Sequence, residues 1–522
     1  MKEFHYGEDL LSPGLALELA GGKIRGVISE KAEARIRKCS DDVQTIVNSR
    51  KIVYGVNTGF GPLCTTIISE EDTKTLQYNI LKSHSVGMGD DVDEEISALM
   101  LVLKMHALSK GYSGIQMETL ERINWHIENR AFPVVPSQGS VGASGDLAPL
   151  AHLFLPLIGL GKVHYKGEII TGAELFEREN LSPVLLGPKE GLALINGTQF
   201  IAAHAVKALQ RMKNILDCAD IIGAMSLEAL LGSAKPFQKE LHQIRPYEGT
   251  IYVADRLEHM LRGSEILKSH EHCERVQDPY SIRCMPQVHG ASRNAWKHLK
   301  EQLTTELNSV TDNPIILNPE ETISGGNFHG QPMALPLDYS TLASSELGNI
   351  SDRRTYLLLE GTTEGLPKLL MEHTGINSGF MIPQYTSAAL VTENKSLCFP
   401  PSADSVPTSL GQEDHVSMGS ISGRRVNEVI TNVEKILAVE LVCAAQAFDY
   451  RRPLKSAPVL ESCHHAVREV IDHAEVDRVF AHDLEAARKI IASGKLVETA
   501  EKASEDFEID IHGGNNELFG LY

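Results

Sequence analysis

The run Gly-Ala-Ser-Gly-Asp at positions 142–146 consists of residue types that could do chemistry through the backbone itself. If the amide nitrogen of Gly145 attacks the carbonyl carbon of Ala143, a five-membered ring closes. Loss of two waters then leaves an exocyclic methylene derived from Ser144. Gly145 has no side chain to block the attack, and Ala143 is small. The product would be a strong electrophile made from the chain itself.

Two other interpretations of chemistry-bearing residues compete with this one. A serine between glycines suggests a hydrolase, but the hydrolase motif is Gly-X-Ser-X-Gly, and Gly145 comes one residue too early for it. Two histidine-rich patches suggest metal binding, yet neither has paired cysteines or histidines at helical spacing. We therefore interpret them as solvated or hydrogen-bonded histidines. These patches contain His270, His272 and Cys273, and Cys463, His464 and His465.

The segment GSVGASGDLAPLAHL (139–153) resembles the signature of the aromatic amino acid ammonia-lyases. Their electrophile is a 4-methylidene-imidazole-5-one group, which the resemblance implies is formed here from Ala143, Ser144 and Gly145, with no metal or diffusible cofactor. Further similar segments follow in order along nearly the whole chain. They are YGVNTGFGPL (54–63), LINGTQ (194–199), VQDPYSIRCMPQVHGA (276–291), SGGNFHGQP (324–332), NSGFMIPQYTSAALVTENK (377–395) and SADSVPTSLGQEDHVSM (402–418).

The resemblance assigns roles that the elimination of ammonia requires. Tyr54, on a glycine-rich stretch, resembles the catalytic base, which must be partly ionised near neutral pH. Asn196 resembles the asparagine near the carbonyl of the electrophile, where an amide donor would stabilise negative charge. Arg283 resembles the residue that binds the substrate carboxylate with its planar guanidinium.

Three further residues match positions that shape the site. Tyr280 resembles a tyrosine that orders the site, and it would share a face with Arg283 if that segment is helical. Phe328 resembles an aromatic residue packed near the electrophile. Gln277 resembles a polar residue that lines the site.

Two positions predict the substrate. His84 matches a selectivity position, although a similar Ser-His pair also occurs in relatives that act on tyrosine. Glu413 is more informative, because its carboxylate can pair with an imidazole nitrogen, whereas relatives that act on phenyl or phenol rings commonly have glutamine there. The expected reaction is L-histidine to trans-urocanate and ammonia, the first step of histidine degradation. The alternatives are a tyrosine or phenylalanine ammonia-lyase or aminomutase and, from another class, an inert helical scaffold.

Hydrophobic periodicity predicts long helices over residues 198–232, 340–360 and 423–450, which must bury their faces against one another. We expect a mainly α protein with a mixed N-terminal domain (1–196) that carries the Ala-Ser-Gly loop. A helical-bundle domain (197–522) would follow, with a loosely held acidic tail from residue 498. The resemblance implies a long central bundle like that of the fumarase and aspartase superfamily. It also implies a homotetramer whose sites draw on three subunits, with Tyr54 and the electrophile on different chains.

Composition narrows the cellular setting. The chain has 522 residues and a formal net charge of −20, so it would repel nucleic acids. Its eight cysteines form no Cys-X-X-Cys pair, as is typical of reduced cytosolic thiols. The first residues do not resemble a signal peptide, and no long apolar run suggests a membrane span. We expect a cytoplasmic enzyme with a small-molecule substrate.

Overall fold

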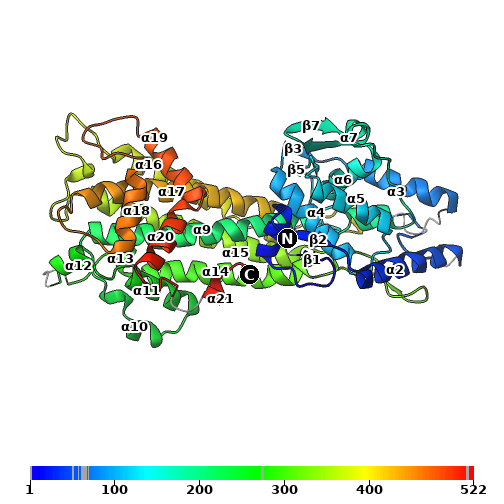
Figure 1. The fold of residues 1–522 in the computed structure, drawn as a ribbon, viewed down its shortest axis with the longest axis horizontal. Helices are drawn as coiled ribbons and strands as arrows, with labels where there is room; N and C mark the ends of the chain where they lie inside the picture. The colour runs from blue at the N-terminus through cyan, green and yellow to red at the C-terminus, as the bar shows by residue number, and fades with distance from the viewer. Residues whose placement is uncertain are drawn as a thin grey trace.

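The structure, a computed structural model, describes residues 3–49, 52–56, 58–59, 68, 70–271, 276–512 and 516–522. It is elongated, with a lobe at one end of a long helical bundle (Figure 1). The lobe contains α2 to α7, and the bundle runs from it to the opposite end, where α12 and α13 lie. The expected mainly α fold with a long central bundle is therefore confirmed.

The first helices of the chain belong to the lobe or to its junction with the bundle. They are α1 (Pro13–Ala20), α2 (Glu30–Asn48), α3 (Glu70–His84), α4 (Glu94–Leu108), α5 (Met117–Glu128), α6 (Leu147–Phe154), α7 (Gly172–Glu179) and α8 (Glu190–Ile195). Every residue of α4 from Ile96 to Leu108 is buried, so this helix forms the core of the lobe.

The strands are short and form small separate sheets. They are β1 (Glu3–His5), β2 (Arg25–Val27), β3 (Met88–Asp91), β4 (Phe132–Pro133), β5 (Pro136–Gln138), β6 (Lys162–Tyr165), β7 (Glu168–Thr171), β8 (Ile315–Ile316) and β9 (Thr322–Ile323). The largest sheet is antiparallel in the order β4-β6-β7, with Val163 opposite Ile170. The pair β1-β2 is parallel, and the pairs β3-β5 and β8-β9 are antiparallel.

Four long helices form the bundle: α9 (Gln199–Ala229), α14 (Met285–Leu307), α15 (Gln331–Leu359) and α17 (Gly419–Asp449). The other helices are α10 (Lys239–Gln243), α11 (Glu248–Met260), α12 (Glu265–Ser269), α13 (Tyr280–Arg283), α16 (Met381–Leu397), α18 (Pro458–Arg468), α19 (Phe480–Ala492), α20 (Lys495–Asp506) and α21 (Asn516–Phe519). Short 3-10 turns span Leu155–Ile158, Lys235–Phe237, Lys368–Leu370, Pro401–Ala403 and Ser409–Gly411.

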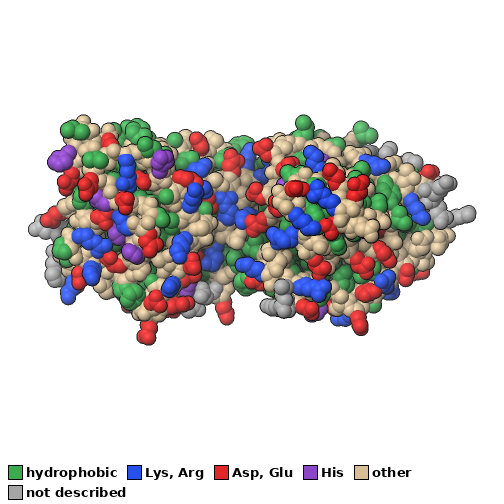
Figure 2. All heavy atoms as spheres, turned by 45° about the horizontal axis from the view of Figure 1, so that its top comes forward, with side chains coloured by type: hydrophobic (Ala, Val, Ile, Leu, Met, Phe, Trp, Pro, Cys, Tyr) green, Lys and Arg blue, Asp and Glu red, His purple; other side chains and the backbone are tan. Residues whose placement is uncertain are grey.

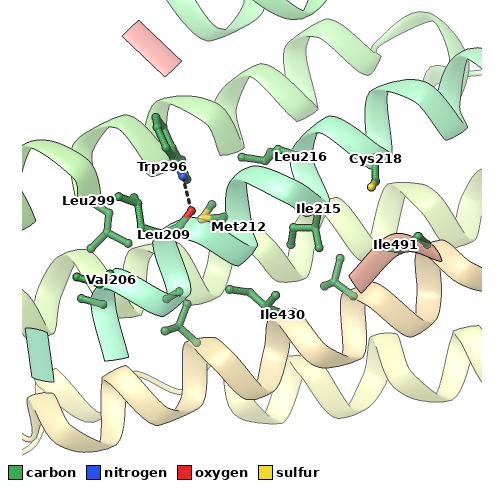
Figure 3. Packing of buried hydrophobic residues seen from close by; sticks show 14 of the residues in the cluster. Val206, Leu209, Met212, Ile215, Leu216, Cys218, Trp296, Leu299, Ile430 and Ile491 are labelled. Carbon is green, nitrogen blue, oxygen red and sulfur yellow. Dashed lines mark hydrogen bonds between the residues drawn. The ribbon is translucent and has the colours of Figure 1, made fainter. Parts of the chain in front are cut away.

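The bundle is held together by apolar side chains that recur at helical spacing. On α9, Val206, Leu209 and Met212 are each at most 1% exposed and lie on a face packed among neighbouring helices (Figure 3). Full burial of one such side chain stabilises the fold by about 1.5–3 kcal/mol. Trp296 of α14 satisfies its indole N–H by donating to the Leu209 carbonyl, 2.8 Å away. The packing therefore also meets the polar requirement of its largest side chain.

A buried ionic cluster lies within this apolar bundle. The Asp220 carboxylate contacts Arg293 at 2.5 Å and the His289 ring at 2.8 Å, and Glu440 binds Arg354 through both oxygens. Burial alone would raise the pKa of Asp220, but the neighbouring Arg293 and His289 lower it overall. Because each charge has a partner, removing one would leave an uncompensated buried charge at a cost of about 3–5 kcal/mol.

The predicted long helices are confirmed, with one boundary moved. The segments predicted over 198–232 and 423–450 correspond to α9 and α17. The segment predicted over 340–360 begins earlier, at Gln331, with Pro332 in its first turn and Pro336 inside the helix. Proline is tolerated in a first turn, where its missing N–H has no partner to lose. The predicted domain boundary at 196/197 falls between α8 and α9 and stays a prediction.

The prediction of a loosely held C-terminal tail is wrong. Residues 498–506 belong to α20, and Ile511 and Phe519 are 1% and 2% exposed. The Phe519 ring lies 4.7 Å from that of Tyr252, and the Leu521 carbonyl accepts a hydrogen bond from the Gly14 N–H of α1. A few apolar residues thus anchor the segment despite its acidic composition.

Acidic and basic side chains are intermixed over the face of the molecule seen in Figure 2. The helices in the described part of the chain include none that is both long and apolar enough to cross a membrane.

Candidate active site

The Ala-Ser-Gly loop, residues 139–146, connects β5 to α6 and contains three glycines with positive φ angles, Gly139, Gly142 and Gly145. Gly142 and Gly145 have φ angles of +70° and +75°, which side chains strongly disfavour. A Cβ atom on Gly145 would also lie only 2.1 Å from the Gly197 carbonyl oxygen. Only glycine fits at this position, and its backbone is pressed against the segment that precedes α9.

That segment holds the carbonyl oxygen of Ser144 from two sides. The Asn196 side-chain nitrogen donates to this oxygen at 3.0 Å, and the Gly197 N–H donates at 3.3 Å. The Asp146 N–H in turn donates to the Gly197 carbonyl at 2.7 Å. Two N–H donors therefore converge on one carbonyl oxygen, an arrangement that stabilises negative charge on it.

Asp146 is buried beneath the loop and joins it to α9. One oxygen accepts a hydrogen bond from the Ser140 hydroxyl, and the other accepts from the Ile201 N–H. Burial raises the pKa of Asp146 to about 7, against these hydrogen bonds. The group is therefore held largely protonated at slightly acidic pH.

A cavity of about 990 Å³, the loop cavity, opens beside Ser144. It brings together most of the residues predicted from the sequence. Those that line it are Tyr54, His84, Ala143, Ser144, Asn196, Phe328 and Glu413. Tyr54 lies in a turn at residues 54–56, and Phe328 precedes α15. Gly145, which the sequence also predicts, lies next to this wall in the loop.

The two predicted selectivity residues, His84 and Glu413, both line the loop cavity. Glu413 accepts hydrogen bonds from the Ser144 hydroxyl at 3.0 Å and from Thr408 and Ser409 at 2.8 and 2.9 Å. His84 ends α3, and its ring nitrogen lies 3.0 Å from the Ser83 hydroxyl. Burial lowers the pKa of His84, although the Glu413 charge opposes this shift. A neutral imidazole and a carboxylate thus face one space.

The remaining three predicted residues, Gln277, Tyr280 and Arg283, lie elsewhere. Gln277 and Arg283 line a second cavity of about 740 Å³, the α13 cavity. The Arg283 guanidinium lies 4.6 Å from the centre of the Tyr280 ring and donates to the Asp278 carbonyl at 2.9 Å. The expected common face of Tyr280 and Arg283 is therefore confirmed, because both belong to the helical turn α13.

The two cavities lie at opposite ends of the bundle. Asn196 comes three residues before α9 begins, whereas Gly232 and Ser233, which line the α13 cavity, come three and four residues after it ends. A helix of 31 residues is roughly 45 Å long at 1.5 Å per residue. An amino acid bound beside Ser144 therefore cannot reach Arg283 of the same chain.

One expectation about the assembly needs correction. Tyr54 was expected on a different chain from the electrophile, but Tyr54 and Ser144 line one cavity of a single chain. The predicted site residues that lie far from the electrophile within one chain are instead those of the α13 cavity, which include Arg283. Sequence order could not distinguish these two arrangements, because every motif lies far from the others along the chain.

Sequence reasoning missed two groups around the loop cavity. His329 and His415 line it, with ring centres 5.7 Å apart. Behind the wall, Lys104 of α4 donates to the Asn196 carbonyl at 2.5 Å. The available signal for Lys104 was a single lysine within the apolar run of residues 98–108.

The histidine-rich patches have ordinary partners where the structure describes them. His270 is hydrogen-bonded to the Ile266 and Gly232 carbonyls, and His464 contacts Asp449 at 2.9 Å. His272 and Cys273 lie outside the described residues. Within the described ranges, no group of three or more His, Cys, Asp or Glu side chains is arranged as a metal site.

Comparison with known proteins identifies the family. The sequence profile of the family described as aromatic amino acid lyase matches residues 11–469. The chain is 47% identical to a histidine ammonia-lyase of Sorangium cellulosum, over 91% of this chain and 93% of the relative. Among solved structures, histidine ammonia-lyase from Trypanosoma cruzi is 39% identical, with a TM-score of 0.89 and coverage of 100% and 97%. A tyrosine aminomutase from Streptomyces globisporus is 33% identical, with a TM-score of 0.89 and coverage of 95% and 97%. On this evidence the chain belongs to the aromatic amino acid lyase family.

Proposed function

We propose that the protein eliminates ammonia from L-histidine and releases trans-urocanate. In this reaction the Cα–N bond breaks, a proton leaves Cβ, and a carbon–carbon double bond forms. The observation that carries the proposal is the convergence of Tyr54, the Ala-Ser-Gly loop, Asn196 and Glu413 on one cavity. The histidine ammonia-lyases among its relatives support the same substrate.

The residues of the loop fit a 4-methylidene-imidazole-5-one group formed from Ala143, Ser144 and Gly145. A bond from the Gly145 nitrogen to the Ala143 carbonyl carbon would release one water, and loss of the Ser144 hydroxyl would release a second. Gly145 has no room for a side chain, and the carbonyl oxygen of Ser144 is already held by two donors. When formed, the group supplies an electrophilic carbon that makes the substrate amine a better leaving group.

The side chains of the loop cavity take the other roles. Tyr54 accepts the Cβ proton, since its hydroxyl is the base that the sequence predicts in this cavity. Asn196 and the Gly197 N–H stabilise negative charge on the Ser144 oxygen. Phe328 provides an apolar wall that limits access of water. These assignments use residues of one chain only.

Arg283, Tyr280 and Gln277 would complete the site from another copy of the chain. Arg283 can bind a carboxylate through two parallel hydrogen bonds, but it lies roughly 45 Å from Ser144 by the length of α9. A homotetramer in which the α13 cavity of one subunit meets the loop cavity of another provides the missing clamp. The proposal therefore requires assembly for activity.

Glu413 supports histidine over the tyrosine alternative. A carboxylate accepts a charge-assisted hydrogen bond from an imidazole N–H, worth about 1.5–3 kcal/mol. A phenyl ring has no donor, so it would desolvate the carboxylate without giving it a hydrogen bond in return. His84 adds a second polar partner on the same cavity.

The decisive experiment offers L-histidine, L-tyrosine and L-phenylalanine to the purified protein and follows the conjugated acid products by ultraviolet absorbance. Intact-mass measurement of the same preparation should give a chain lighter than the encoded one by two waters. Ser144→Ala should lose most activity and should not show this mass loss in full. Preferred turnover of tyrosine would replace histidine as the substrate, and an active chain of full encoded mass would refute the self-made group.

A further inference from the structure

A lysine is buried in the core of the lobe, directly behind the loop cavity. Lys104 lies on α4 among apolar residues and is 1% exposed. Taking an ammonium group out of water is costly unless it finds a strong acceptor. The apolar packing of α4 does not offset this cost, so a polar partner of the Lys104 ammonium group is needed.

The acceptor is the backbone carbonyl of Asn196. The Lys104 nitrogen donates to this oxygen at 2.5 Å, which is short for such a bond. The pKa of Lys104 is lowered to about 7, chiefly by burial and also by the Lys189 charge, while Asp312 and Asp146 oppose this shift. Asp312 itself is paired with Lys189 at 2.6 Å. The nearby carboxyl groups thus oppose, in part, the loss of the positive charge that burial favours.

The bonded carbonyl belongs to the peptide group whose N–H faces Ser144. The Asn196 C=O and the Gly197 N–H are two ends of one planar amide, and that N–H donates to the Ser144 carbonyl. A hydrogen bond accepted at the C=O end polarises the amide and makes its N–H a stronger donor. Lys104 is therefore connected to the Ser144 oxygen through a single peptide group.

We propose that Lys104 is a positioning residue that strengthens and orients the Asn196–Gly197 donors at the carbonyl oxygen of Ser144. This inference rests on the proposed function. When a nucleophile adds to the carbon derived from the Ser144 side chain, its lone pair forms the new bond and the alkene pair shifts towards this oxygen. The donors then hold more negative charge than before addition, so Lys104 favours the charged state over the resting state.

A merely structural lysine would give a different pattern, and three variants separate the two roles. Lys104→Met keeps the apolar stem and removes the donor. Lys104→Gln keeps a neutral donor without the charge. His106→Leu is the matched control, because His106 is a buried polar residue of the same helix whose ring accepts a hydrogen bond from the Gly7 N–H, away from Asn196.

Each variant is measured in four ways as the assembled full-length enzyme. Thermal unfolding reports stability, and intact mass reports the loss of two waters. Steady-state kinetics separate kcat from KM. Finally, the rate at which added cyanide becomes attached to the chain is followed by intact mass without substrate, which reports addition to the electrophile independently of turnover.

We expect Lys104→Met to lose both waters fully and to bind substrate with a KM within about twofold of the parent. Its kcat and its rate of cyanide addition should both fall, by about tenfold to a hundredfold, less than for loss of a direct donor. Lys104→Gln should lie between this variant and the parent. His106→Leu should unfold at a lower temperature with both rates unchanged.

Three results would overturn the proposal. The first is a pair of Lys104 variants with unchanged kcat and cyanide rates. The second is activity lost only in proportion to chains that keep their full mass, which would place Lys104 in formation of the group. The third is an equal loss in His106→Leu, which would make the effect structural. A parent chain without the mass loss and without ammonia release would instead refute the proposed function, whatever the variants do.

Discussion

The loop cavity and the α13 cavity of one chain differ in what each can do. The loop cavity holds the predicted base Tyr54, the Ala-Ser-Gly loop and the carboxylate of Glu413. The α13 cavity offers the guanidinium of Arg283 over the Tyr280 ring. Among the described residues that line them, neither cavity combines the Ala-Ser-Gly loop with an arginine that could hold a carboxylate. Under the proposed function, the chain would carry two incomplete halves of a site, one at each end of α9.

The largest expected effect comes from mixing two inactive variants, one damaged in each cavity. Ser144→Ala and Arg283→Met should each lose activity at least about a thousandfold, because each removes a whole role. After subunit exchange, roughly a quarter of randomly paired sites would combine an intact loop cavity with an intact α13 cavity. Recovered ammonia release by the mixture would be the measurement.

The control for this mixture uses two variants of the same cavity. Ser144→Ala mixed with Tyr54→Phe should recover nothing, because both residues line the loop cavity of one chain. Recovered ammonia release in this control would contradict the assignment of the two cavities to different subunits of one site. So would a lack of recovery in the first mixture after mass spectrometry has verified subunit exchange.

The next effect concerns substrate choice within the loop cavity. Glu413→Gln should lower kcat/KM for histidine tenfold or more, since about 1.4 kcal/mol corresponds to each decade. The ratio of kcat/KM for histidine over tyrosine should fall with it, because the cost of desolvating the Glu413 charge against an apolar ring disappears. Asp414→Asn is the matched control, an adjacent carboxylate that also lines the cavity. An equal change in that control would assign the preference to overall charge rather than to Glu413.

A third prediction concerns the stability of the loop cavity, because the Ala-Ser-Gly loop packs over the buried carboxyl group of Asp146. Since burial raises the pKa of Asp146 to about 7, the folded chain keeps a proton that the unfolded chain releases near 3.8. This contribution to the free energy of unfolding is fully present below about pH 4. It is lost as the pH rises to about 7, by on the order of 4 kcal/mol at 1.36 kcal/mol per unit.

Asp146→Asn should therefore flatten the pH dependence of Tm between about pH 4 and 7. The amide oxygen can still accept from the Ile201 N–H, and its nitrogen can donate to the Ser140 hydroxyl oxygen. Asp91→Asn, at an exposed position on β3, should leave the profile of the parent unchanged. A parent-like slope in Asp146→Asn would show that another group causes it.

The smallest effect on activity is expected for substitutions in the C-terminal segment, which packs on the bundle between the two cavities. Phe519→Ala should lower the free energy of unfolding by about 3 kcal/mol, because a ring that is 2% exposed and packed on Tyr252 is removed. Phe507→Ala, whose ring belongs to a residue that is 53% exposed, should cost less than about 0.5 kcal/mol. Both should keep the kcat of the parent. A loss of kcat in Phe519→Ala would mean that the tail couples to one of the cavities.

The fold was predictable where local signals and burial agree. The proline-free apolar pattern of α9 predicted that helix to within a few residues at each end. The beginning of α15 was missed, because prolines near a helix start look like breaks in the sequence. The tail was misjudged because its many acidic residues outweigh Ile511 and Phe519 in composition, although these two provide the buried contacts.

The candidate site was predictable as a set of residues and not as an arrangement. Motifs indicated Tyr54, Asn196 and Glu413, and the structure brings them to one cavity. The same kind of motif indicated Arg283, which lies at the other end of the bundle. Sequence order contains no information on which copy of the chain supplies a side chain. Lys104 was missed because a single lysine within an apolar run does not reveal which backbone carbonyl it contacts.

The length of helix α9 fixes a distance within each subunit. It begins three residues after Asn196 and ends four residues before Ser233, so its length sets the spacing between the two cavities of a subunit. Inserting one residue would move everything beyond it by 1.5 Å and rotate it by about 100°. Seven inserted residues would nearly restore the orientation but would lengthen the helix by about 10 Å. In a closed assembly that matches one end to another, the register of α9 is therefore as fixed as the identity of the residues at its ends.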